Sequence, residues 1–104
     1  MKILVILPTY NEVDNLGRVV EGIFGLRINP DILIVDDNSS DGTKITAQAL
    51  SDKYAGRIFL KERAGKLGLG SAYIEGFSFA LKQKYDYVFE MDADLSHNPE
   101  EIPN

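Results

Sequence analysis

The fold is decided by residues 3–7, which read Ile-Leu-Val-Ile-Leu and lead into Pro-Thr-Tyr-Asn-Glu at residues 8–12. Five consecutive large aliphatic side chains make an extended chain apolar on both faces, which is typical of a strand covered on both sides in a parallel sheet. Similar short runs occur at residues 32–35, 57–60 and 87–91. We therefore predict four buried parallel strands.

Helical patterns separate these runs. Apolar residues recur on one helical face at Leu16, Val19, Val20, Ile23 and Phe24, more weakly at Ala47, Leu50 and Tyr54, and again at Tyr73, Phe77, Ala80 and Leu81. We expect Glu12 and Asp14 in the first turn of the first helix, where the helix dipole favours negative charge. The alternation of strands and helices predicts an α/β fold, with a Rossmann-like parallel sheet and flanking helices.

The composition narrows the class of protein. The 104 residues include 11 basic and 16 acidic side chains, for a net charge of −5, so we expect no nucleic-acid partner. The absence of cysteine excludes a disulfide framework. No apolar run approaches the roughly 20 residues of a membrane-spanning helix. Because the first strand follows Met1-Lys2 directly, we expect no signal peptide and a cytoplasmic location; the oligomeric state stays open.

The last residues resemble the beginning of another helix. Asn98 is a typical cap, and it is followed by Pro99, Glu100 and Glu101. A sheet of four strands would also leave an edge strand uncovered. We therefore expect residues 1–104 to form one half of a single longer domain, truncated at its C-terminus.

Acidic residues gather where ligands bind in such folds, which is outside the carboxyl ends of the strands. Five aspartates lie at strand ends or in the loops directly after them: Asp36, Asp37, Asp41, Asp92 and Asp94. Two acids in a turn are commonly a solvated cap, but Asp92 and Asp94 follow a buried strand directly. Grouped carboxylates repel one another unless a cation joins them. We therefore predict that Asp92 and Asp94 bind Mg²⁺ or Mn²⁺.

Two interpretations of Asp37 remain open, a cap on the second helix or a ligand for a nucleotide base or ribose. Asp41, which precedes Gly42, is predicted to serve the turn alone. Arg63 and Lys66 either offset diphosphate charge or are solvated surface charges.

Aromatic and histidine side chains near these loops have simpler interpretations. Tyr73 and Phe77 are expected in the core rather than against a ligand. His97 has no second histidine or cysteine nearby in the sequence, so we expect it to be a loop residue and not a metal ligand.

Together the loops resemble those of the family 2 glycosyltransferases of the GT-A fold. The matching segments are residues 8–12, 35–43, 66–73 and 91–97, and the match spans essentially the whole chain. The first two segments occur widely in family 2. The last two make the chain most similar to the polyprenol-phosphate (dolichol-phosphate) mannose synthases within it.

This resemblance implies an enzyme that transfers mannose from GDP-mannose to a polyprenyl (dolichyl) phosphate, with inversion and with Mg²⁺ or Mn²⁺. A lipid acceptor implies that the reaction takes place at a membrane surface, with the full-length protein bound peripherally to the cytoplasmic face of that membrane. Residues 1–104 would be the nucleotide-binding half of the GT-A domain and inactive alone. The residues implied to bind the nucleotide sugar are Pro8, Tyr10, Glu12, Val35, Asp37, Asp92, Ala93 and Asp94. Among them, Asp92 and Asp94 would be catalytic and would hold the metal.

Other functions remain as alternatives. One is a family 2 enzyme that uses a UDP-sugar, such as a polyprenyl-phosphate glucosyltransferase, and another is a non-catalytic nucleotide-binding α/β module. A receiver domain or a phosphatase with a D-x-D nucleophile would need acids directly after the first strand. This chain has Pro-Thr-Tyr-Asn there, at residues 8–11, which argues against both classes.

Overall fold

The structure is a computed structural model that describes residues 2–63 and 69–91, with Leu69 described by its backbone alone. Within these residues strands and helices alternate as predicted. The elements are β1 (Ile3–Thr9), α1 (Leu16–Phe24), β2 (Asp31–Asp36), α2 (Thr43–Lys53), β3 (Ile58–Glu62), α3 (Leu69–Lys82) and β4 (Tyr87–Glu90).

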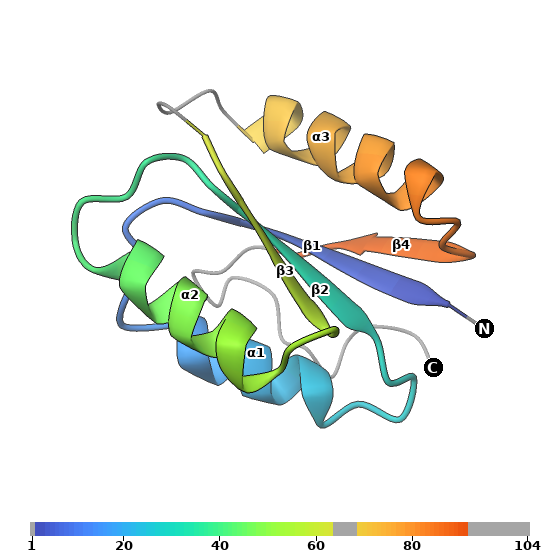
Figure 1. Ribbon diagram of the computed structural model, residues 1–104, viewed down its shortest axis with the longest axis horizontal. Coiled ribbons are helices and arrows are strands. Elements are labelled where there is room, and N and C mark those ends of the chain that lie inside the picture. Colours follow the sequence, from blue (N-terminus) through green and yellow to red (C-terminus); the bar gives the residue numbers. More distant parts are fainter. Residues whose placement is uncertain (1, 64–68, 92–104) are drawn as a thin grey trace.

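All four strands are parallel and lie in the order β3-β2-β1-β4. Helices α1 and α2 cover one face of the sheet and α3 covers the other, so the molecule has three layers (Figure 1). The order reverses beside β1, because β2 and β3 lie on one side of it and β4 on the other. Such a reversal point is where open α/β sheets bind ligands, at the carboxyl ends of the strands.

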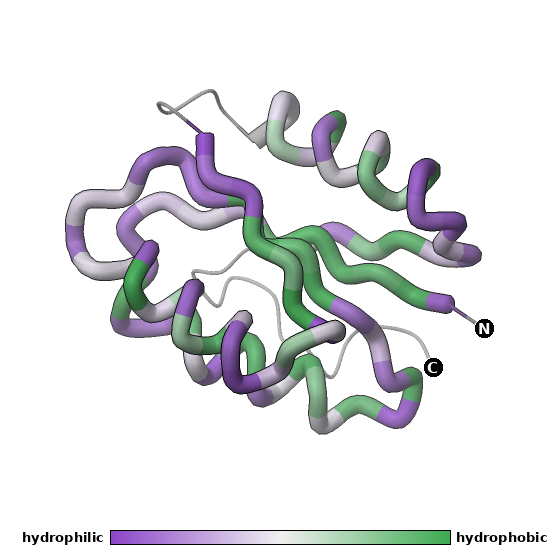
Figure 2. Tube along the Cα trace, in the orientation of Figure 1, coloured by the Kyte–Doolittle hydropathy of each residue, from purple (hydrophilic) through white to green (hydrophobic). Residues whose placement is uncertain are grey.

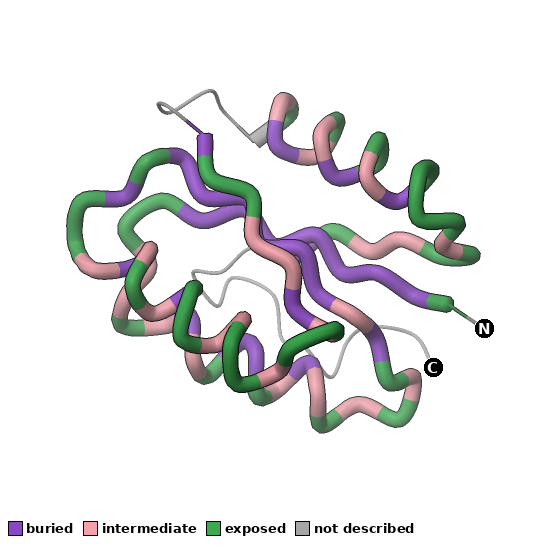
Figure 3. The backbone as a smooth tube through the Cα atoms, in the orientation of Figure 1, coloured by how far each residue is buried: buried purple, intermediate pink, exposed green. Residues whose placement is uncertain are grey.

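Strand β1 is the centre of the core. All seven of its residues are buried, which explains why its sequence is apolar on both faces. Val5 and Leu7 pack against α1, whereas Leu4 and Ile6 belong to the cluster beneath α3. Each buried side chain of this size contributes about 1.5–3 kcal/mol of hydrophobic stabilisation. The hydrophobic and the buried parts of the trace coincide along this strand and β2 (Figures 2 and 3).

Helix α1 buries the predicted stripe but begins later than predicted. Its buried residues are Leu16, Val19, Val20 and Ile23. Glu12 and Asp14 lie before the helix, whose N-cap is Asn15, so their predicted place in the first turn is wrong. The Glu12 carbonyl oxygen accepts hydrogen bonds from the backbone N–H groups of Asn15 (3.1 Å) and Leu16 (3.0 Å). Glu12 and Asp14 therefore belong to a turn that precedes the helix.

Helix α3 differs from the sequence prediction in the face that it buries. Phe77 is 40% exposed and Leu81 is 81% exposed, so their predicted place in the core is wrong, although Tyr73 does pack against the core. The buried face consists of small residues at a spacing of four: Ala72, Gly76 and Ala80. Small side chains let the helix backbone approach the sheet closely. Tyr73 and Phe79 pack beside this face, whereas Ile74, Phe77 and Leu81 are exposed.

This close approach predicts a stability cost for enlarging Gly76. A Cβ atom there would lie 2.7 Å from Cγ1 and 2.8 Å from Cγ2 of Ile6. We expect Gly76→Ala to lower the free energy of unfolding by about 1–3 kcal/mol, because overpacking outweighs the gain in helix propensity. Urea denaturation provides the measurement. Gly17→Ala in α1 is the control, since no atom lies within 4 Å of its added Cβ. A Gly76→Ala protein as stable as the Gly17→Ala protein would contradict the close packing.

Candidate functional site

The carboxyl ends of three strands meet at one edge of the sheet. Thr9 of β1 is paired in register with Asp36 of β2, which is paired in turn with Glu62 of β3. The loops that follow these strands therefore start side by side. Residues 92–104, which include the predicted metal ligands Asp92 and Asp94, lie outside the described residues.

A buried carboxylate, that of Asp36, joins the first two strand ends. Its Oδ1 accepts hydrogen bonds from the hydroxyls of Thr9 and Ser39, each at 2.6 Å, and its Oδ2 accepts one from the Ser39 backbone N–H at 2.9 Å. Asp36 is fully buried, and these bonds offset the cost of removing its charge from water. Its carboxylate therefore serves the scaffold rather than a ligand.

The loop after β1 and the loop after β2 form one hydrogen-bonded unit. The Asn11 N–H donates to Ser39 Oγ, and the Ser40 N–H donates to Asn11 Oδ1, each at 2.9 Å. The Glu12 N–H donates to Thr43 Oγ1 at 2.8 Å. Asn11 has a φ of 55°, a left-handed conformation that asparagine tolerates better than most residues. Neither loop can move without breaking bonds to the other.

Asp41 serves the turn before α2, as predicted, but not the turn alone. Its Oδ1 accepts hydrogen bonds from the backbone N–H of Thr43 at 3.0 Å and from the Thr43 hydroxyl. The hydroxyl bond is the main cause that holds the pKa of Asp41 below its usual value. Gly42 beside it has a φ of 100°, which few other residues adopt without strain. Asp41 also accepts a bond from the Val13 N–H at 3.3 Å, which adds a further link between the two loops.

Asp37 forms an ion pair instead of a helix cap. The Nε of Arg63, directly after β3, donates to Asp37 Oδ1 at 2.5 Å, and both side chains are less than a tenth exposed. The N-cap of α2 is Gly42, five residues further along the chain, so the interpretation of Asp37 as a cap on this helix is wrong. Arg63 is also not a solvated surface charge. Lys66, the other residue predicted either to offset diphosphate charge or to be solvated, lies outside the described residues.

The remaining predicted residues occupy the same edge. Pro8 and Val35 are buried and face each other in register on β1 and β2. Tyr10 is 41% exposed, and Glu12 is half-buried in the same loop. Pro8, Tyr10, Glu12, Val35 and Asp37 thus follow or end two adjacent strands, whereas Asp92, Ala93, Asp94 and His97 are outside the described residues. Among the residues that are described, no three acidic or histidine side chains gather closely enough to hold a metal ion.

Sequence reasoning missed the two internal contacts of the site, which are the bonds to Asp36 and the Arg63–Asp37 pair. The first has a weak local signal, because aspartate and serine side chains commonly form hydrogen bonds with nearby backbone groups in turns. The second joins residues 26 positions apart, and nothing in the spacing indicates it.

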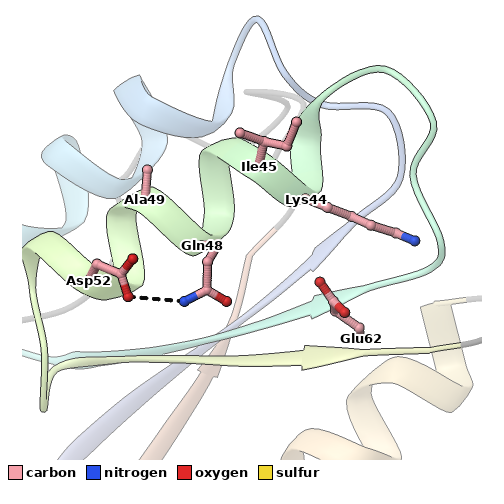
Figure 4. Close-up of a pocket in the computed structure, with 6 residues that line it drawn as sticks. All are labelled: Lys44, Ile45, Gln48, Ala49, Asp52 and Glu62. Atoms are coloured by element: carbon pink, nitrogen blue, oxygen red, sulfur yellow. Dashed lines mark hydrogen bonds between the residues drawn. The ribbon is translucent and has the colours of Figure 1, made fainter.

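A shallow pocket of about 430 Å³ is lined by residues of α2 and by the last residue of β3 (Figure 4). It is lined by Lys44, Ile45, Gln48, Ala49, Asp52 and Glu62. Its polar groups are partly engaged with each other, since Gln48 Nε2 donates to Asp52 Oδ1 at 3.0 Å. Among the described residues, none that is predicted to bind a nucleotide lines this pocket.

Residues 4–104 match the sequence profile of Glycosyl transferase family 2. The chain belongs to this family. It is 44% identical over 99 residues to the polyprenol monophosphomannose synthase of Mycolicibacterium smegmatis, a match that covers 95% of this chain and 37% of that protein. It is 41% identical over 103 residues to the undecaprenyl-phosphate mannosyltransferase of Micrococcus luteus, which covers 99% of this chain and 42% of that protein. The chain therefore spans less than half the length of both relatives.

Two solved structures share the fold. The mannosyltransferase PcManGT from Pyrobaculum calidifontis, solved in complex with GDP-Man and Mn²⁺, superposes with a TM-score of 0.77 at 25% identity over 89% of this chain and 27% of that one. S. aureus TarS in complex with UDP superposes with a TM-score of 0.70 at 24% identity over 90% of this chain and 28% of that one, which shows the fold alone. The predicted α/β sheet of the GT-A type is confirmed.

Removing the buried carboxylate should destabilise the site scaffold. Asp36→Ala leaves the Thr9 and Ser39 donors without their shared acceptor, and each unsatisfied buried donor costs about 1–3 kcal/mol. We expect urea denaturation to show a loss of at least about 2 kcal/mol, with faster hydrogen exchange at the Asn11 and Ser40 amides.

Asp52→Ala is the matched control for this experiment. It removes an exposed carboxylate whose bond to Gln48 is on the surface of α2, so we expect a change within about 0.5 kcal/mol. Equal losses of stability in the two variants would show that Asp36 does not hold the loops.

Proposed function

We propose that this chain is the nucleotide-binding half of a glycosyltransferase domain that transfers mannose from GDP-mannose to a polyprenyl phosphate, with inversion. The observation that carries the proposal is the 44% identity, over 95% of the chain, to a polyprenol monophosphomannose synthase. The undecaprenyl-phosphate mannosyltransferase, at 41% identity over 99% of the chain, supports the same acceptor class. The complex of PcManGT with GDP-Man supports the donor.

The proposed nucleotide site lies at the ends of β1 and β2. Hydrogen bonds hold the loop that carries Tyr10 and Glu12 against the loop after β2, which begins with Asp37. An ionised carboxylate only accepts hydrogen bonds, so Asp37 suits the N–H donors of a base edge or the hydroxyls of a ribose. The Val35 side chain belongs to the core, so this residue would contact the nucleotide through its backbone. Pro8 would shape the floor of the site.

We propose Mg²⁺ or Mn²⁺ as the cofactor, held by Asp92 and Asp94 with the donor diphosphate near Ala93. The supports are the D-x-D spacing after β4 and the Mn²⁺ in the related PcManGT complex. The chemistry that such an ion supplies is neutralisation of the charge on the departing diphosphate. The lipid phosphate is itself an anionic nucleophile, so the proposal needs no strong protein base.

The proposed acceptor places the reaction at a membrane surface, with the full-length protein peripheral to its cytoplasmic face. Both relatives are named for a polyprenyl-type lipid phosphate, which supports this location. No helix within residues 2–63 and 69–91 is long and apolar enough to cross a membrane.

Transfer by the full-length protein tests the proposal directly. Purified protein with Mn²⁺ should move radiolabelled mannose from GDP-mannose to a short-chain polyprenyl phosphate and leave free polyprenol unmodified. UDP-glucose and GDP-glucose, offered in parallel, should be poor donors. Efficient transfer from UDP-glucose with none from GDP-mannose would overturn the donor assignment, and binding of GDP without any transfer would favour a non-catalytic module.

The metal assignment predicts a separate effect of Asp94→Asn. This variant should retain its circular dichroism spectrum and melting temperature but lose at least about a hundredfold in transfer rate, because a ligand of the metal is neutralised. Asp86→Asn is the control, since that carboxylate lies at the opposite end of β4, where it accepts a hydrogen bond from the Lys2 backbone N–H. Wild-type turnover by a folded Asp94→Asn protein would remove Asp94 from the site.

A further inference from the structure

We propose that Arg63 is a positioning residue for nucleotide recognition, which acts by holding the Asp37 carboxylate in place at the ends of the strands. The inference rests on the proposed function, in that Asp37 is taken to contact the nucleoside. Arg63 itself is assigned no contact with the nucleotide. Its proposed effect passes through Asp37.

The geometry holds Arg63 from two sides. Its Nε donates to Asp37 Oδ1 on the loop after β2, and its Nη1 donates to Ser71 Oγ at 2.8 Å in the first turn of α3. The same Nη1 lies 3.9 Å from Glu75 Oε1, one turn further along α3. The guanidinium therefore bridges a loop on the sheet edge and a helix on the sheet face.

The backbone of Arg63 is fixed as well as its side chain. Its N–H donates to the carbonyl oxygen of Asp36 at 2.8 Å, next to the buried Asp36 carboxylate. The Asp37 N–H in turn donates to the Thr9 carbonyl oxygen at 3.0 Å. Both partners of the ion pair thus start from strand ends that already hold each other, which leaves the side chains little freedom.

A gain in protein stability does not by itself explain why a buried ion pair is present here. Two charges less than a tenth exposed lose hydration, and well-packed apolar residues of similar size often stabilise a protein as well or better. What an apolar pair cannot do is present a carboxylate in a fixed orientation. Arginine suits this task because its planar fork reaches two acceptors at once, whereas lysine offers a single point charge.

The experiment measures GDP affinity by titration calorimetry, in the full-length protein with Mn²⁺, for Arg63→Met, Arg63→Lys, Asp37→Asn and the double variant Arg63→Met/Asp37→Asn. We expect Arg63→Met to weaken GDP binding about tenfold or more, since Asp37 loses the group that orients it. Arg63→Lys should fold and bind with intermediate affinity. The double variant should bind no more weakly than Asp37→Asn alone.

The same variants distinguish an effect on folding from an effect on nucleotide recognition. Arg63→Met leaves Asp37 buried with its charge uncompensated and is expected to melt early, whereas the double variant removes both charges and should recover the melting temperature without recovering GDP affinity. Affinity for Mn²⁺-pyrophosphate, which has no base or ribose, should be unchanged in every variant. A role in stability alone would not produce this divergence between GDP and pyrophosphate.

Arg57→Met is the matched control. Arg57 is the last residue of the turn before β3, at the opposite end of the sheet, where its Nε pairs with Asp31 at 3.5 Å. The Arg57→Met protein should bind GDP as the wild type does. Wild-type affinity in folded Arg63→Lys and in Arg63→Met below its melting temperature would overturn the inference. Additive losses in the double variant, or an equal loss of pyrophosphate affinity, would overturn it too by giving Arg63 a separate role. A wild-type protein that binds neither GDP nor UDP would instead refute the proposed function, and the inference with it.

Discussion

The hydrogen bonds to the buried Asp36 carboxylate hold together the parts of the molecule on which the site depends. They tie the end of β1, through Thr9, to the loop after β2, through Ser39. Ser39 Oγ also accepts from the Asn11 N–H, so the same hydroxyl links Asp36 to the loop that carries Tyr10 and Glu12. A buried charge is tolerated here because three donors replace its hydration. Two loops that are far apart in the sequence are thereby joined by hydrogen bonds at this edge.

The packing of α3 contributes from the other face of the sheet. Its small buried residues, among them Gly76 against Ile6, bring the helix close to β1. That approach sets the position of the first turns of α3, from which Ser71 and Glu75 reach Arg63. A helix held further away by large side chains would not place those groups at the guanidinium. The core packing and the orientation of Asp37 are therefore connected through a single arginine.

Charge at this edge is arranged so that each described aspartate has a different task. Asp36 is buried in the scaffold, Asp41 serves the turn before α2, and Asp37 is paired with Arg63. An acidic chain with a net charge of −5 would repel a diphosphate if all its carboxylates faced the ligand. The charge of Arg63 offsets that of Asp37, and hydrogen bonds engage Asp36 and Asp41 within the protein, so less negative charge is left uncompensated at this edge.

The sequence by itself determined the parallel sheet, the alternation with helices and the edge at which the loops meet, because runs such as residues 3–7 and the stripe from Leu16 to Ile23 reflect burial directly. It also indicated the role of Asp41, whose partner Thr43 is two residues away. Only the tertiary structure decided that Phe77 and Leu81 face outward and that Asp37 pairs with Arg63. Periodicity records which side chains are apolar but not how closely two backbones approach. An ion pair between distant residues forms only after the strands have set their ends side by side.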